Sequence, residues 1–175
     1  QLLWCMLADL YLAHYQNNNY VIDQRSRIEE GLPQDINTWT QKQYQIKITD
    51  ILGKSLENQA ISKNTDILTL KTLISVEDSA LIYTPTLFDF IVEKNIRTAL
   101  VFHDHDFIQS MYRQWIDFRK EQQDDALTLL TELDFVTYQE KQKMNDNYLQ
   151  QLDSLERFYI HSPVIVELWA KKASY

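Results

Sequence analysis

The stretch VFHDHDF, residues 101–107, holds two histidines and two aspartates in consecutive positions: His103, Asp104, His105 and Asp106. Imidazole and carboxylate groups are ordinary ligands of zinc, iron and manganese, so these residue types suit a metal site. In an extended strand, the two histidines would project from one side and the two aspartates from the other. At the carboxyl end of a buried strand, where ligands of open α/β sheets gather, the four residues could therefore form a metal site.

In a helix the same side chains diverge, because residues two apart point about 200° apart. His103 and His105 could then not bind one ion. We predict a continuous helix over residues 98–118, because apolar residues recur there at helical spacing. The apolar stripe consists of Leu100, Phe107, Met111, Trp115 and Phe118. On this interpretation His103 is a hydrogen-bonded core histidine, while Asp104 and His105 face water.

The stretch FHDHDF also resembles the short T-x-D-x-D-F element of PIN-type ribonucleases. The resemblance implies a metal-dependent nuclease in which Asp104, at the position of the first acid, binds the metal. It covers six residues, and Phe102 stands where the element has threonine. The H-x-H-x-D-H pattern of metallo-β-lactamase-like hydrolases is broken, since Phe107 and Ile108 occupy its last two positions. A metal-dependent hydrolase or nuclease with its site at residues 103–106 is therefore the alternative function.

Glycine is scarce in this chain of 175 residues, which has two glycines and three prolines. Average usage is about 7% and 5%. Tight β-turns, bulges and phosphate-binding loops depend on glycine, whereas helices joined by short polar loops do not. Hydrophobic residues make up 45% and charged residues 24%, which is typical of a globular protein. We predict a single all-α domain over residues 1–175, bundle-like, with five to seven helices and the long helices after residue 85.

Apolar spacing and turn residues predict the helices of the first half. Leucines at positions 3, 7 and 10 form a helical stripe, and QNNN at 16–19 is expected to end that helix before a second one at 20–30. A later stripe contains Tyr44, Ile48, Ile51 and Leu52. Its subsegment YQIKIT alternates between polar and apolar residues, which leaves a strand open as an alternative.

The second half has neither glycine nor proline from residue 86 to residue 162. Long helices are therefore expected there, interrupted at KEQQDD (120–125) and NDN (145–147). Proline is favoured at the first helical position, so Pro85 is expected to open one helix. Ser162 and Pro163 form an N-cap and first-position pair for the last helix.

Charge and cysteine usage limit the classes of partner. The net charge of −8 repels a phosphate backbone, so we do not expect a nucleic-acid partner. Cys5 is the single cysteine, which excludes an internal disulfide and a cysteine-based zinc cluster. This usage agrees with a cytoplasmic protein, or a membrane-associated one that faces a reducing compartment.

The most apolar stretch, LLWCMLADLYLA at residues 2–13, is too short to span a bilayer and contains Asp9. We interpret it as a core helix. The alternative is the tail of a membrane helix that begins before Gln1.

The signatures of several enzyme classes are absent from the sequence. It has no zincin H-E-x-x-H, Walker loop, Rossmann fingerprint or G-x-S-x-G motif, and no motif that predicts a cofactor or a catalytic residue. Aromatic residues make up 12% of the chain, and aromatics with polar tips often anchor interfaces. We therefore predict a non-enzymatic helical interaction or assembly module that binds a protein partner or a second copy of itself.

Overall fold

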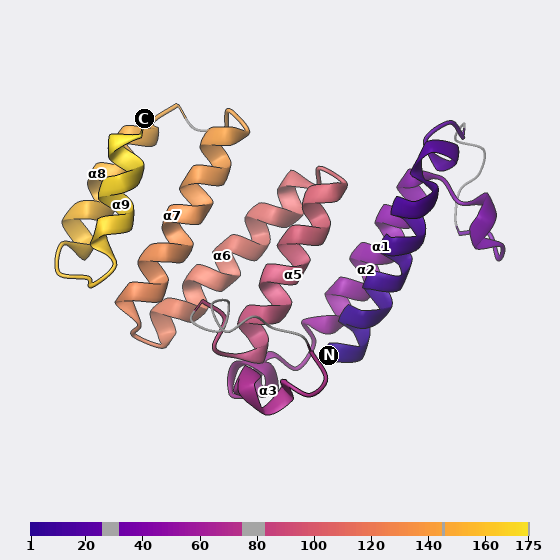
Figure 1. The fold of residues 1–175 in the computed structure, drawn as a ribbon, viewed down its shortest axis with the longest axis horizontal. Coiled ribbons are helices and arrows are strands. Elements are labelled where there is room, and N and C mark those ends of the chain that lie inside the picture. The colour runs from indigo at the N-terminus through magenta and orange to yellow at the C-terminus, as the bar shows by residue number, and fades with distance from the viewer. Residues whose placement is uncertain (26–31, 75–82, 145, 175) are drawn as a thin grey trace. The chain divides into compact units, whose positions relative to one another are not determined.

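The computed structural model describes residues 1–25, 32–74, 83–144 and 146–174. These ranges contain eight α-helices and two short 3-10 helices, shown in Figure 1. Their only bridge of the β type is an isolated one between Asp66 and Thr86, and they contain no strand. The all-α fold is confirmed. Three helices of 15 to 17 residues lie after residue 85, as expected, but the longest described helix, Leu2–Ile22 with 21 residues, lies before it. The described ranges contain eight α-helices, one more than the five to seven expected, because short helices such as α3 (Gln59–Lys63) add to the long ones.

The chain divides into two compact units, Gln1–Asp104 and His105–Tyr175. The expectation of one domain over the whole chain stays a prediction. Within the described ranges, no helix combines the length and the apolar character that crossing a membrane requires.

The first unit is built on α1 (Leu2–Ile22), α2 (Gln41–Ser55) and α5 (Leu87–Val101), which pack against one another. Figure 1 shows α1 running alongside α2. The 3-10 helices Ile36–Thr38 and Ile67–Leu70 lie in the connections, and the side chains of Asp35 and Asp66 cap their first turns. The described part of the unit thus has three main helices, and its two 3-10 helices begin with aspartate caps.

The helix predicted from Tyr44, Ile48, Ile51 and Leu52 is confirmed as α2, and all four side chains are buried. The strand alternative for YQIKIT is therefore wrong. A capping box starts α2, because the backbone N–H of Thr40 donates to Oε1 of Gln43 at 2.9 Å. This reciprocal bond satisfies an N–H group that the helix itself leaves unpaired.

The expected break at QNNN is wrong, because α1 continues through it to Ile22. Asn18 remains helical and its side-chain amide donates to the carbonyl of His14 at 2.8 Å. The second helix expected at 20–30 therefore overlaps α1 at its start, and the part from residue 26 onward lies outside the described residues. The buried face of α1 is also not the leucine stripe, since Cys5, Ala8, Tyr15 and Ile22 are the buried residues.

Two predicted helix starts are shifted by a few residues. The N-cap of α5 is Thr86, whose hydroxyl accepts from the backbone N–H of Asp89 at 3.2 Å, so Pro85 precedes the helix. The last helix, α9 (Ile165–Ala173), begins after a turn at Pro163. Ser162 still supports this turn, because its Oγ accepts from the backbone N–H of Val164 at 3.4 Å.

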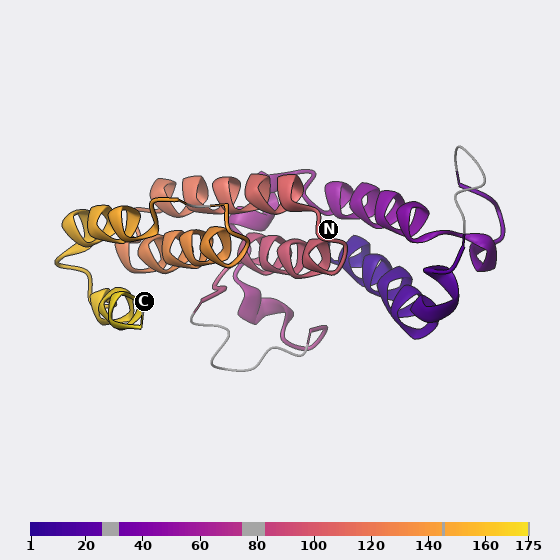
Figure 2. The same cartoon turned by 90° about the horizontal axis from the view of Figure 1, so that it is seen from above.

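The second unit contains α6 (His105–Glu121), α7 (Asp125–Lys141), α8 (Tyr148–Tyr159) and α9. Helix α7 packs against α6, α8 and α9, as Figures 1 and 2 show. The interruptions predicted near 120–125 and 145–147 are confirmed by the helix bounds, since α6 ends at Glu121 before α7, and α7 ends at Lys141 before α8 begins at Tyr148. The core that joins α7, α8 and α9 contains Leu129, Leu133, Val136, Tyr148, Leu152, Ile165 and Leu168.

Residues other than glycine occupy left-handed backbone positions after three long helices: His103, Gln123 and Lys143, with φ of 53°, 56° and 55°. Glycine normally takes this position because it has no Cβ to clash with the following carbonyl. The turn after α7 illustrates the geometry, since the N–H of Lys143 donates to the carbonyl of Glu140 at 2.9 Å. The chain thus forms these turns without using glycine.

Replacing Gln123 with glycine should raise the free energy of unfolding by about 1 kcal/mol, because it removes the Cβ strain at positive φ. Urea denaturation measures the change. The neighbouring variant Gln122→Gly is the control, since Gln122 continues the helical hydrogen bonding of α6 and should lose stability on this change. If Gln123→Gly also lowers stability, the left-handed turn is not strained.

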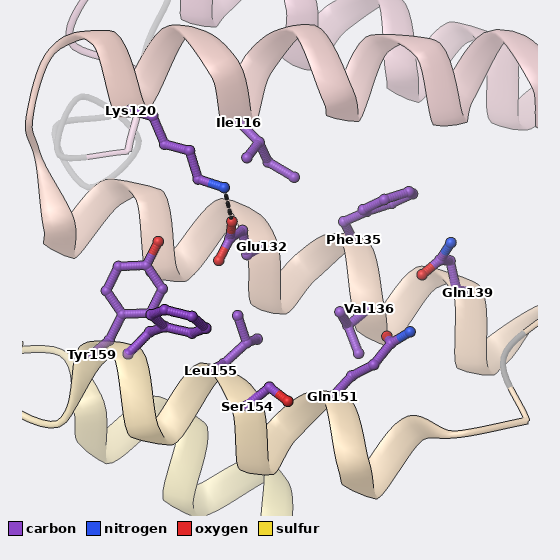
Figure 3. A pocket seen from close by; sticks show the side chains of 11 residues that line it. Ile116, Lys120, Glu132, Phe135, Val136, Gln139, Gln151, Ser154, Leu155 and Tyr159 are labelled. Atoms are coloured by element: carbon purple, nitrogen blue, oxygen red, sulfur yellow. Dashed lines mark ion pairs between the residues drawn. The ribbon is translucent and has the colours of Figure 1, made fainter.

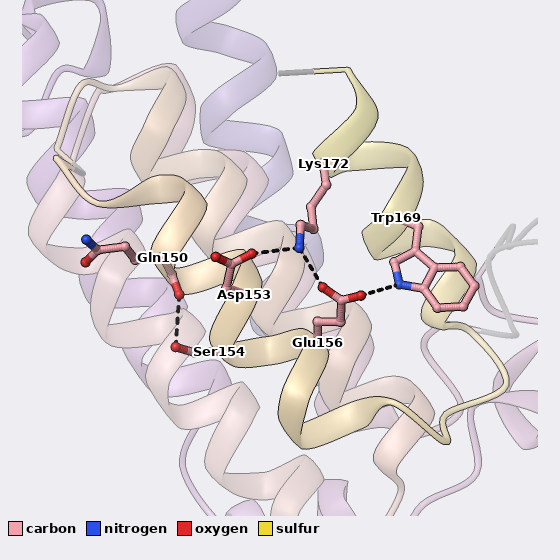
Figure 4. A network of polar contacts seen from close by, with 6 residues as sticks. All are labelled: Gln150, Asp153, Ser154, Glu156, Trp169 and Lys172. Atoms are coloured by element: carbon pink, nitrogen blue, oxygen red, sulfur yellow. Dashed lines mark hydrogen bonds and ion pairs between the residues drawn. The ribbon is translucent and has the colours of Figure 1, made fainter.

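A polar network joins the exposed sides of α8 and α9 (Figure 4). Nζ of Lys172 lies 2.7 Å from Oδ1 of Asp153 and 2.5 Å from Oε2 of Glu156, whose other oxygen accepts from Nε1 of Trp169 at 2.8 Å. The hydrogen bonds from Lys172 lower the pKa of Asp153 and of Glu156 from their ordinary values of 3.8 and 4.5.

Because these carboxyl pKa values are lower in the folded state, the network stabilises the fold above the ordinary values and loses its effect as pH falls through the lowered ones. We therefore expect Lys172→Met to destabilise the protein at neutral pH and to match the wild type in strong acid. Urea midpoints measured from pH 7 downward check this. Lys171→Met is the control, because it leaves the network intact, and its stability relative to the wild type should not change with pH in this way. A loss of stability in Lys172→Met that is the same at every pH would contradict the assignment.

Candidate functional site

The HDHD segment lies at a turn between two helices. Helix α5 ends at Val101, and the backbone N–H groups of His103 and Asp104 donate to the carbonyls of Leu100 and Ala99 at 3.3 and 3.2 Å. These two bonds form the Schellman motif that closes a helix C-terminus. The continuous helix predicted over 98–118 is therefore wrong, because the left-handed His103 ends α5 before α6 begins at His105.

The turn sends the four polar side chains to different surroundings. His103 is exposed, so its assignment as a core histidine is wrong. Asp104 is half-buried and accepts from Nε2 of Gln45 at 3.0 Å. His105, expected to face water, is half-buried with its Nδ1 2.6 Å from the hydroxyl oxygen of Tyr138, and Asp106 is exposed. The histidine of this segment that joins two helices is thus His105, which links α6 to α7.

The described residues contain no group of three or more histidine, cysteine, aspartate or glutamate side chains that could hold a metal ion. The segment also does not follow a strand, which is the position that the metal-site interpretation required. A metal site at residues 103–106 stays a prediction, and metal analysis of the purified protein tests it. Stoichiometric metal that is lost in both His103→Ala and Asp104→Ala would establish it.

Replacing His105 with alanine should lower the free energy of unfolding by about 1–3 kcal/mol, because the hydroxyl of Tyr138 loses this part-buried hydrogen bond between α6 and α7. Urea denaturation measures the change. His103→Asn is the control, since asparagine tolerates the left-handed position and His103 is exposed. Its effect should stay within about 0.5 kcal/mol. Equal losses in the two variants would contradict the distinct roles of the histidines.

A groove of about 640 Å³ lies on the second unit, where α6, α7 and α8 succeed one another (Figure 3). Each helix contributes residues that recur at steps of three or four and therefore share one helix face. The lining residues are Ile116 and Lys120 on α6, Glu132, Phe135, Val136 and Gln139 on α7, and Gln151, Ser154, Leu155, Phe158 and Tyr159 on α8.

The middle of the groove is apolar and its two ends are polar. Phe135, Val136 and Leu155 line the middle, and Phe158 is 85% exposed. Gln139 and Gln151 lie together at one end in Figure 3, while the charged pair lies toward the other. The groove can therefore take up apolar side chains along its middle and hydrogen-bond to polar groups at its ends.

The charged side chains that line the groove neutralise each other. Nζ of Lys120 lies 2.6 Å from Oε1 of Glu132. Burial raises the pKa of the Tyr159 hydroxyl, and the charge of Glu132 and a hydrogen bond to it raise the pKa further. Tyr159 is therefore a neutral phenol that donates to Glu132, so a ligand entering the groove meets no isolated charge from this pair.

Sequence reasoning missed this groove, although it identified part of the pattern. Tyr148, Leu152, Leu155 and Tyr159 recur at steps of four, three and four, which is helical spacing, and the structure divides this stripe between core and groove. Tyr148 and Leu152 belong to the core, whereas Leu155 and Tyr159 line the groove. One signal was available in the sequence. The breaks near residues 123 and 144 are short, and short connections between long helices predict that successive helices pack as antiparallel neighbours.

Comparisons of the chain with protein families, with curated proteins and with solved structures found no match.

Proposed function

We propose that the protein is a non-enzymatic helical interaction module that binds an amphipathic helix of a partner protein in the groove of α6, α7 and α8. The observation that carries the proposal is the groove itself, with its apolar middle and its hydrogen-bonding ends. Recognition of an amphipathic helix by an apolar groove is a common mode of peptide binding.

The dimensions of the groove suit a helix. From Gln151 to Phe158 the lining of α8 extends over two helical turns, about 10 Å, and the lining of α7 from Glu132 to Gln139 has the same length. Rows of side chains at steps of three and four form the ridges into which a further helix packs. A partner helix with apolar residues at positions i, i+4 and i+7 would fill these rows.

The charges favour a partner helix whose docking face is uncharged. Lys120 and Glu132 are already paired, so an apolar face would not leave either charge buried alone. The amides of Gln139 and Gln151 can satisfy polar groups at the other end. We therefore expect aliphatic or aromatic side chains in the middle of the partner's docking face and polar groups at its ends.

Photo-crosslinking tests the proposal and identifies the partner in the same experiment. The photoreactive residue p-benzoylphenylalanine would replace Phe158, the exposed aromatic at the groove, in full-length protein expressed in its own cells. We expect a covalent adduct that mass spectrometry maps to an amphipathic helical peptide. Leu149, also exposed on α8 but outside the groove lining, is the control position and should give no such adduct.

The apolar middle of the groove provides a second control. Leu155→Gln, introduced into the protein that carries the crosslinker at position 158, should reduce the adduct, because it removes apolar lining from the groove. Circular dichroism checks that this variant still folds. Equal adducts at positions 149 and 158, or none at 158, would contradict the proposal. An adduct to a small molecule rather than a peptide would also contradict it.

A further inference from the structure

A row of exposed residues runs along the outer side of α1, and we call it the outer seam. Leu3, Leu10 and Tyr20 of this row are 78%, 69% and 77% exposed. The complete outer seam consists of Leu3, Met6, Leu10, Ala13, Asn17 and Tyr20, all exposed. Its steps are three, four, three, four and three residues, which is the repeat of a helix that pairs with another helix.

The outer seam lies on the side of α1 opposite its buried face. Cys5, Ala8 and Tyr15 point toward the interior of the first unit, where α2 and α5 pack on α1. At 100° per residue, Leu10 is rotated by roughly 160° from Ala8. Helix α1 is therefore apolar on two opposite faces, and the contacts with α2 and α5 cover the inner one.

We propose that α1 pairs in antiparallel orientation with α1 of a second copy of this chain through the outer seam. Side-chain sizes along the seam fit this arrangement. The midpoint of the seam lies between Leu10 and Ala13, so antiparallel pairing places each leucine at position 10 against the small side chain at position 13. It also places Leu3 against Tyr20, and Met6 against Asn17. Alternation of large and small side chains allows two helix faces to interdigitate.

Charge does not oppose a second copy at the outer seam, although it does so elsewhere on the surface. The chain carries a net charge of −8, so two copies repel each other over most of their surfaces. The outer seam contains no charged residue, and Asp9, the one acidic residue of α1, is paired with Lys94 at 2.7 Å. Two copies can therefore approach through α1 without facing like charges. Antiparallel pairing further sets the two helix dipoles in the favourable orientation.

The size of the seam predicts a reversible dimer. From Leu3 to Tyr20 the seam is about 26 Å long and one helix wide. This is smaller than the roughly 800 Å² per partner of a standard stable interface. We expect the dimer to dissociate on dilution, with a dissociation constant in the micromolar range.

Sedimentation velocity over a concentration series from about 1 to 300 μM tests the dimer. Leu10→Glu places a charge at the centre of the seam and should weaken association at least about tenfold. Leu73→Glu is the matched control, because Leu73 is 65% exposed in the same unit and lies outside the seam. It should associate like the wild type. A wild type that is monomeric throughout, or equal effects of the two variants, would overturn the proposal.

Disulfide trapping tests the orientation. Mixed Leu10→Cys and Ala13→Cys proteins should form a cross-linked pair faster than Leu10→Cys alone, because antiparallel pairing brings positions 10 and 13 together. Unmodified protein is the background, since Cys5 is buried. Faster self-linking of Leu10→Cys would overturn the antiparallel arrangement.

Two further measurements distinguish the dimer from lipid binding by the seam and from partner binding in the groove. If the protein stays monomeric but binds phosphatidylglycerol vesicles, and Leu10→Glu abolishes this binding, the seam is a lipid-binding face and the dimer is wrong.

The dimer is also independent of the groove. Leu10→Glu should dissociate the dimer and leave the adduct from position 158 unchanged, and loss of that adduct in this variant would contradict the separation of the two surfaces.

Discussion

Leu152→Ala is expected to lower the free energy of unfolding of the second unit by roughly 2–5 kcal/mol. Leu152 is fully buried on α8 and packs in the core that α7, α8 and α9 share. Truncation removes buried apolar surface and leaves a cavity, because the surrounding helices cannot fully collapse into it. Urea denaturation followed by circular dichroism measures the loss.

Leu149 provides a control for Leu152 on the same helix. Leu149 is exposed, so Leu149→Ala should change the free energy of unfolding by less than about 0.5 kcal/mol. Both variants alter helix propensity equally, and their difference therefore isolates the cost of the cavity. Similar losses in the two variants would mean that α8 does not pack on α7 as described.

The all-α class could be predicted because its determinants are local. Two glycines in 175 residues leave few positions for tight β-turns, and the stripe from Tyr44 to Leu52 follows one helix face. Such stripes depend only on the helical repeat. For the same reason the four apolar residues on the buried face of α2 were predicted, whereas its buried polar residues Gln43 and Ser55 were not.

The turn at residues 102–104 could not be predicted, because its signal is normally a glycine. His103 adopts the left-handed conformation here, and apolar residues on both sides of it keep a helical spacing. The resulting stripe from Leu100 to Phe118 therefore continued across a real helix end. This error also misplaced the histidines, since closing α5 exposes His103 and directs His105 toward Tyr138.

Helix α1 illustrates a different limit of sequence reasoning. Its leucine stripe and its Cys5, Ala8 and Tyr15 face are both apolar, so spacing alone does not decide which one packs inside. The choice depends on partners that are distant in sequence. Tyr44 packs on Tyr15, and Leu87 and Ile91 pack in one buried cluster with Cys5. The groove of the second unit has the same origin, because it exists only when three separate helices pack side by side.

Tyr44→Ala is expected to cost the first unit roughly 3–5 kcal/mol of unfolding free energy. The ring of Tyr44 is fully buried and lies 5.3, 5.6 and 5.8 Å from the rings of Trp39, Tyr15 and His14. Its removal would leave a large cavity between α1 and α2. Tyr44→Phe keeps the ring and should cost only about 0.5–2 kcal/mol, because it removes the hydroxyl alone.

The hydroxyl of Tyr44 lies 2.7 Å from Nδ1 of His14 and 3.2 Å from the carbonyl oxygen of Ile36, to which it donates. A double-mutant cycle of Tyr44→Phe and His14→Ala isolates the bond between α1 and α2. We expect the two losses to be non-additive by about 0.5–2 kcal/mol, since either change alone breaks the same hydrogen bond. Additive losses would show that this bond contributes nothing, and that ring packing alone fixes α1 on α2.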